Sequence, residues 1–92
     1  MNTLRTCPKP HPDIRLKRLG ATGILLNVRS GDFFELDEPA LSIWQRLDGK
    51  TEPATLARHL AASFGAPVAV VERDVRQFIG TLRKRRLLDG AR

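Results

Sequence analysis

The hydrophobic period of this sequence changes once, near residue 36, and this change limits the folds that the chain can adopt. Before that point, alternate positions are apolar over residues 14–19, 24–28 and 33–36, a period of two that is typical of half-buried strands. After it, apolar residues recur every three or four positions, which is the period of an amphipathic helix. The sequence therefore predicts three strands followed by helices.

Short turns that contain glycine join the predicted strands. Residues 20–23 interrupt the first alternation, and residues 29–32 form a tight turn in which Gly31 can adopt a positive φ. Loops this short join antiparallel neighbours, so we expect a meander. Within the second and third strands, the residues that share one face are Ile24, Leu26 and Val28, and Phe34 and Leu36.

Three helices are expected after the strands, each with signals of its own. Pro39, Pro53 and Pro67 stand near the three first turns, where a missing N–H does no harm. Gly49 and Gly65 end the first two helices. The apolar stripes expected to face the core are, in chain order, Ala40, Ile43, Trp44 and Leu47; Leu56, Leu60 and Phe64; and Val71, Val75, Phe78 and Leu82, widened by Val68 and Ile79.

Three strands followed by three helices predict an α+β domain, with a three-stranded antiparallel sheet that carries the helices on one face. A helix, a turn and a longer helix beside strands are typical of a winged helix-turn-helix. The 92 residues have room for one such domain, over residues 14–89, and we expect Leu87 and Leu88 to turn back onto its core. Residues 1–13 are expected to form a flexible, basic, proline-rich arm, and residues 90–92 a tail.

Signals for export or membrane insertion are absent from this sequence. No apolar run approaches the roughly 18 residues that a membrane-spanning helix needs, and residues 1–5 lack the apolar stretch of a secretory signal. Cys7 is the single cysteine, so no disulfide can form within the chain. We therefore expect a cytoplasmic protein that has no membrane partner.

Residues suited to catalysis or metal binding are sparse. Cys7 and His11 are too few ligands for a closed zinc site, and His59 lies on an ordinary amphipathic helix. Asp37 and Glu38 are explained by helix capping, and no glycine-rich phosphate-binding loop is present. We therefore expect no enzymatic activity, no cofactor and no metal.

The charge of the chain favours either an acidic partner or simple solubility. Lysine and arginine outnumber the acids by 16 to 10, which gives a net charge of +6, and the excess lies at the two ends. The winged-helix outline suggests DNA, but residues 66–71, which begin the third helix, offer no side chain that reads bases. The basic run over residues 83–86 lies at the other end of this helix and can contact phosphates. Nucleic-acid binding is therefore kept as the alternative function.

An uncovered sheet edge offers a different mode of binding, because an extended peptide can pair with it as an additional strand. Main-chain hydrogen bonds supply the affinity of such pairing, and pockets for alternate side chains supply the specificity. Residues 33–36, beside a long helix with an apolar face, can provide both. We expect Phe34 in the core, whereas Phe33 has the opposite parity and less reason to be buried. The same edge allows either a monomer or a dimer paired through this strand.

Several short motifs of this chain, in their order and spacing, resemble those of one family. The motifs are Ser-Gly-Asp-Phe-Phe-Glu-Leu-Asp over residues 30–37, Ile43-Trp44, Leu47-Asp48-Gly49, Asp74-Val75, Phe78-Ile79 and Leu82. They resemble the PqqD-like family of RiPP recognition elements, which bind leader peptides of ribosomally made and post-translationally modified precursors. The similarity covers residues 14–88, and residues 30–36 with Trp44 are more similar to the elements of lasso-peptide systems than to the quinone-cofactor member. Neither the arm nor the run over residues 83–86 belongs to the family pattern.

The resemblance implies that a leader peptide pairs with the third strand and lies against the third helix. The peptide-binding residues that it implies are Asp32, Phe33, Phe34, Glu35, Leu36, Val71, Arg73, Asp74, Val75, Arg76, Phe78 and Ile79. Arg73 and Arg76 would then meet acids of the leader, or else belong to a solvated face. The implied role is non-catalytic: the domain presents the precursor to a separate maturation enzyme, such as a radical-SAM enzyme, a leader protease or a cyclase, in lasso-peptide or pyrroloquinoline quinone (PQQ) biosynthesis.

Overall fold

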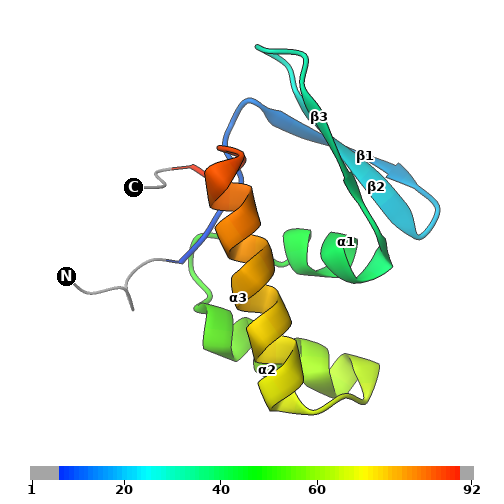
Figure 1. Cartoon of the computed structure of the whole chain (residues 1–92), viewed down its shortest axis with the longest axis vertical. Helices are drawn as coiled ribbons and strands as arrows, with labels where there is room; N and C mark the ends of the chain where they lie inside the picture. Colours follow the sequence, from blue (N-terminus) through cyan, green and yellow to red (C-terminus); the bar gives the residue numbers. More distant parts are fainter. Residues whose placement is uncertain (1–6, 90–92) are drawn as a thin grey trace.

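Three antiparallel strands in the order β1-β2-β3 form one side of the molecule, and three helices follow them (Figure 1). The computed structural model describes residues 7–89. The elements are β1 (Ile14–Leu19), β2 (Thr22–Asn27), β3 (Phe33–Leu36), α1 (Glu38–Trp44), α2 (Pro53–Phe64) and α3 (Val68–Lys84). In Figure 1, α1 lies between the sheet and α2, and α3 runs alongside α2. The expected α+β fold is confirmed.

The turn between β2 and β3 is held by the side chain of Asn27. Its Oδ1 accepts hydrogen bonds from the backbone N–H groups of Arg29, at 2.8 Å, and Ser30, at 3.1 Å. Gly31 has a φ of 82°, a left-handed conformation that a side chain would disfavour. This local geometry sets the register in which β3 returns along β2.

Two aspartates organise the connections around α1. Asp37 is the N-cap of α1, and its carboxylate accepts a hydrogen bond of 3.0 Å from the Ala40 N–H. Asp48 accepts hydrogen bonds from the N–H groups of Lys50, at 2.8 Å, and Thr51, at 2.9 Å, in the turn that leads to α2. The start of α1 and the turn before α2 therefore follow from short-range chemistry that the sequence already displays.

The core lies between the inner face of the sheet and the three helices. Its most deeply buried side chains are Leu25, Leu36, Leu56, Leu60, Val75 and Leu82. Leu87 and Leu88 are also buried, which confirms that the segment after α3 turns back onto the core. The expected core stripes are confirmed for most positions of α2 and α3.

Two residues at the ends of these apolar stripes are exposed, contrary to the expectation. Phe64 and Val68 were expected to face the core, but both are exposed, because they flank the turn at which α2 ends and α3 begins. In β2 the buried residues are Gly23 and Leu25, whereas Leu26 is 41 % exposed and Val28, just after the strand, is 51 % exposed. The shared face of Ile24, Leu26 and Val28 is thus the outer face of the sheet.

Residues 9–11 pair with the C-terminal segment instead of forming the free arm that the prolines suggested. Pro10 forms an isolated β-bridge with Leu88, and the His11 N–H donates to the Leu87 carbonyl at 3.0 Å. The Asp89 N–H donates to the Lys9 carbonyl at 2.9 Å. The remainder of the expected arm, residues 1–6, and the expected tail, residues 90–92, lie outside the described residues.

Candidate functional site

The edge of β3 is the first component of the site. β3 pairs only with β2 among residues 7–89, so its other side is open. The Asn27 N–H donates to the Asp32 carbonyl at 2.9 Å, and these residues stand opposite each other in the register of β2 and β3. Because hydrogen-bonded and non-hydrogen-bonded pairs alternate along antiparallel strands, Phe33 and Glu35 belong to non-hydrogen-bonded pairs. Their N–H and C=O groups therefore face the open edge.

The side chains of β3 alternate between the two faces of the sheet. Phe34 packs against the core and Leu36 is buried, on the same face as Leu25. Phe33 is 61 % exposed and Glu35 is exposed on the opposite face. The expectations for Phe33 and Phe34 are confirmed. An added strand would consequently direct every second side chain toward α3.

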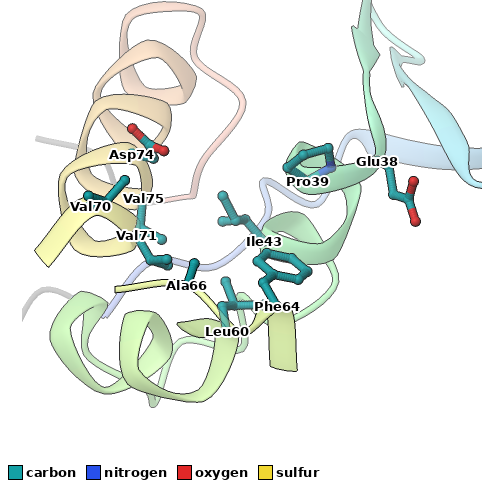
Figure 2. A pocket seen from close by; sticks show the side chains of 10 residues that line it. All are labelled: Glu38, Pro39, Ile43, Leu60, Phe64, Ala66, Val70, Val71, Asp74 and Val75. Carbon is teal, nitrogen blue, oxygen red and sulfur yellow. The ribbon is translucent and has the colours of Figure 1, made fainter. Parts of the chain in front are cut away.

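An apolar hollow of about 360 Å³ lies between α1 and α3, beyond the C-terminal end of β3. Figure 2 shows Pro39 and Ile43 of α1 on one side of it, and Val71 and Val75 of α3 on the other. Leu60 and Phe64 of α2, the linking Ala66, and Glu38, Val70 and Asp74 complete the lining. Such a space, with few polar groups, suits an apolar side chain of a ligand.

A second, smaller hollow of about 220 Å³ lies at the other end of β3. Asp32, Phe33 and Phe34 contribute to it, together with Asn27, Leu87 and Arg85. The Arg85 guanidinium lies over the Phe34 ring, with its central carbon 4.9 Å from the ring centroid. The open edge of β3 is therefore flanked by an apolar hollow at one end and a partly charged hollow at the other.

The residues that the sequence assigned to the third helix occupy different environments. Val71 and Val75 line the apolar hollow, and Asp74 stands at its rim, with its carboxylate 3.8 Å from the Arg73 guanidinium. Phe78 is half-buried against the core, and Ile79 is buried within it. Val71, Asp74 and Val75 thus come together at the apolar hollow, whereas Phe78 and Ile79 belong to the core.

The Arg76 side chain pairs with a residue of its own helix. Its guanidinium donates two hydrogen bonds, of 2.7 Å and 3.0 Å, to the Glu72 carboxylate one turn earlier. Arg73 is also exposed and already lies near Asp74. Because these pairs offset the charge of both arginines, neither of them is the cation most available to a ligand beside the apolar hollow.

Sequence reasoning missed Pro39, Ile43 and Arg85 as parts of the site. Pro39 and Ile43 fit the pattern of an ordinary helix start and core stripe, so no local signal marks them as lining residues. Arg85 belongs to a basic run that suits any helix C-terminus. Only packing places Pro39 and Ile43 across from α3 and brings Arg85 over the Phe34 ring.

Residues 7–89 contain no group of three or more potential metal ligands. His59 is exposed, and the His11 Nδ1 accepts a hydrogen bond of 3.0 Å from the Asp13 N–H. Hydrogen bonds from the N–H groups of Lys50 and Thr51 hold the pKa of Asp48 below its ordinary value. This lowered pKa is explained by the turn between α1 and α2.

Within residues 7–89, no helix is both long and apolar enough to span a membrane.

The fold is a small α+β domain whose third strand has an open edge, with an apolar hollow beyond the end of that strand. The chain belongs to the PqqD family, because the family model "Coenzyme PQQ synthesis protein D (PqqD)" matches residues 22–88. The family assignment made from the motifs is thereby confirmed.

Relatives in Xanthomonas support this assignment. The chain is 35% identical over 83 residues to the "PqqA binding protein" of Xanthomonas campestris pv. campestris. This alignment covers 90% of each of the two proteins. It is 48% identical over 54 residues to the "PqqA binding protein" of Xanthomonas oryzae pv. oryzae. The match to the latter spans 59% of the length of that relative.

Solved structures share the fold over nearly the whole chain. TbiB1 in complex with the TbiA(beta) leader peptide superimposes with a TM-score of 0.79 at 27% identity, covering 89% of this chain and 95% of that one. Lasso peptide synthetase B1 complexed with the leader peptide gives a TM-score of 0.79 at 25% identity, covering 90% and 98%. The PqqD part of Methylobacterium extorquens PqqCD gives 0.75 at 24% identity, covering 89% and 87%, and that likeness concerns the fold alone.

Proposed function

We propose that this protein binds the leader region of a ribosomally synthesised precursor peptide as a fourth strand on β3. The observation that carries the proposal is the open edge of β3, at which Phe33 and Glu35 turn their main-chain groups outward beside the apolar hollow. Two similar structures hold leader peptides, and the Xanthomonas relatives are PqqA binding proteins. These likenesses support a leader peptide as the ligand.

The chemistry of the edge is suited to a peptide whose sequence varies. Phe33 and Glu35 can each donate one N–H and accept at one C=O, so a strand gains affinity that depends little on its side chains. The hollow lined by Val71 and Val75 then reads a side chain that points toward α3. Dissociation constants from nanomolar to micromolar, roughly −12 to −8 kcal/mol, suit such a contact.

In this proposal the protein has no catalysis of its own and presents the precursor to a separate maturation enzyme. A radical-SAM enzyme, a leader protease or a cyclase would act on the part of the precursor that remains outside the cleft. Support comes from the small size of the domain and from a site that offers mainly outward main-chain groups and an apolar hollow. Nucleic-acid binding has less support, because Val68, Ala69 and Val70, at the start of α3, offer no base-reading groups.

A two-dimensional ¹⁵N NMR titration tests the proposal. The labelled protein is titrated with a synthetic leader peptide from the precursor encoded beside its gene and, separately, with a short DNA duplex. We expect the leader to shift the amide resonances of residues 32–36 and 71–82 and the duplex to shift none of them. Salt-sensitive shifts at residues 83–86 with the duplex, and none with the leader, would instead support the nucleic-acid alternative.

A further inference from the structure

The segment after α3 brings one arginine back to the start of β3. Arg85 is the C-cap residue of α3, and Arg86 adopts a φ of 60°, which reverses the chain. The Leu87 N–H then donates to the Leu82 carbonyl at 2.9 Å, and Leu87 is buried. This reversal leaves Arg85 over the Phe34 ring, whereas the neighbouring Lys84 is exposed at the end of the helix.

The charge of Arg85 has no acidic partner within residues 7–89. The ion pairs in this range engage Lys9, Arg29, Arg73 and Arg76, and no carboxylate lies within 4.0 Å of Arg85. Asp32 lines the same small hollow, but its carboxylate accepts a hydrogen bond of 3.1 Å from the Ser30 hydroxyl. A guanidinium stacked by its face keeps its N–H edge available, and this edge suits a carboxylate.

The register of an added strand determines which residue of the peptide meets Arg85. Phe33 and Glu35 would form the hydrogen-bonded pairs with the peptide, so one peptide residue lies opposite Phe34. Residues opposite each other in paired strands project to the same face, and Phe34 projects toward the core and α3. The side chain opposite Phe34 therefore enters the space beside Arg85.

We propose that Arg85 selects an aspartate or glutamate at the leader residue opposite Phe34. This inference rests on the proposed function and adds a specificity element to the same edge. Side chains on one face of a strand are separated by an even number of residues. The acidic residue and the apolar residue that enters the hollow between α1 and α3 therefore lie an even number of positions apart in the leader.

A mutant cycle on both partners tests this inference. The probe is the synthetic leader of the precursor encoded beside the gene, with each Asp and Glu changed in turn to Asn or Gln. Dissociation constants are measured by calorimetry for the wild type, Arg85→Gln and Arg85→Lys. Lys84→Gln is the matched control, because it removes the same charge one residue away and leaves the stacked guanidinium in place.

We expect Arg85→Gln to weaken binding on the order of fivefold and Lys84→Gln less than twofold. Arg85→Lys retains the charge without the planar guanidinium, and we expect a smaller loss. At one acidic position of the leader, the change to Asn or Gln should weaken binding to the wild-type protein by the same factor as Arg85→Gln does. The same change should cause no further loss of affinity for the Arg85→Gln variant. A ¹⁵N NMR spectrum of Arg85→Gln with the same chemical-shift dispersion as the wild type shows that the variant is folded.

Three outcomes would overturn the inference. Equal losses for Lys84→Gln and Arg85→Gln would mean that only the overall charge contributes. Losses that add independently in the cycle, or a tightly bound leader without any acidic residue, would exclude a direct contact. No binding of the leader to the wild-type protein would instead overturn the proposed function itself, and is therefore distinct from these three results.

Discussion

Phe33 and Phe34 are adjacent in the chain but have opposite roles. Phe33 is 61 % exposed on the outer face of the sheet, opposite Leu26 in the register of β2 and β3. Phe34 is half-buried against the core, opposite the fully buried Leu25, and carries Arg85 on its ring. A strand directs successive side chains to opposite faces, so one position stabilises the fold and the other remains available for contacts.

Substitution of these two phenylalanines by aspartate separates the roles. We expect Phe34→Asp to lower the free energy of unfolding by about 3 kcal/mol, because it loses apolar contacts and places a charge against the core. Phe33→Asp, the matched control, should change it by less than about 1 kcal/mol, because the ring is already in water. Urea denaturation followed by circular dichroism measures both. A Phe34→Asp variant as stable as the wild type would contradict the assignment of Phe34 to the core.

At the scale of elements, β3 combines a packed inner face with an open edge. Its outward N–H groups come from Phe33 and Glu35. The other edge of the sheet is β1, where the Val28 N–H donates to the Asp13 carbonyl at 3.0 Å. The same alternation then turns the Arg18 N–H outward on β1. The two edges thus offer equivalent positions for a matched comparison.

A proline at position 35 should weaken leader binding more than it weakens the fold. Glu35→Pro removes an outward N–H and leaves the pairing of β2 with β3 intact, so the edge strand tolerates it. We expect the leader to bind about tenfold more weakly, measured by calorimetry. Arg18→Pro places proline in the same orientation on β1, and Glu35→Ala removes only the side chain. An affinity for Glu35→Pro that matches these two controls would argue against pairing through β3.

The turn between α1 and α2 makes stability depend on pH through Asp48. Hydrogen bonds from the Lys50 and Thr51 N–H groups hold its pKa below 3.8, its ordinary value. Because the folded pKa is the lower one, the ionised carboxylate stabilises the fold at pH values above 3.8, and this stabilisation is lost as the pH falls through the folded pKa. We expect Asp48→Asn to be less stable than the wild type at pH 6, with a difference that shrinks toward pH 2. Urea titrations across this range measure it, and a difference independent of pH would exclude the effect.

At the scale of the whole molecule, residues 8–11 bind two distant parts of the chain, the turn after α1 and the segment after α3. The Gly49 N–H donates to the Pro8 carbonyl at 2.9 Å, and Pro10 pairs with Leu88. The Lys9 ammonium lies 3.6 Å from the Asp89 carboxylate, in an exposed ion pair of the kind that contributes little. This segment secures the same C-terminal turn that places Arg85 over Phe34.

Removal of residues 1–10 should therefore lower stability, whereas removal of the ion pair should not. We expect the deletion to reduce the free energy of unfolding by roughly 2–3 kcal/mol, because backbone hydrogen bonds to residues 49 and 89 and the contacts of the buried Pro8 are lost. Lys9→Ala should reduce it by less than about 1 kcal/mol. Urea denaturation of the two variants provides the comparison. A deletion variant with wild-type stability would show that this pairing does not support the fold.

The cytoplasmic location and the choice between a monomer and an edge-paired dimer stay predictions. Light scattering of the protein with and without the leader addresses the second of these. A dimer paired through β3 would dissociate as the leader binds, because both use the outward groups of Phe33 and Glu35.

Sequence by itself determined the order of the elements, the entries of the helices and the parity of β3. These features depend on residues close together in the chain: Asp37 bonds to Ala40, and Asn27 bonds to the turn that follows it. The family motifs also lie within such short stretches, which is why the sequence alone could propose residues 32–36 as the edge that binds a peptide.

Tertiary structure decided which side of the sheet is buried and which groups border the open edge of β3 and its two hollows. In β2, both Leu25 and Leu26 have apolar side chains, and only the packing of the helices against one face buries Leu25. Pro39, Ile43 and Arg85 reach the site through contacts between residues far apart in sequence. Local periodicity describes one element at a time, whereas burial and the position of a charge depend on the elements that pack against it.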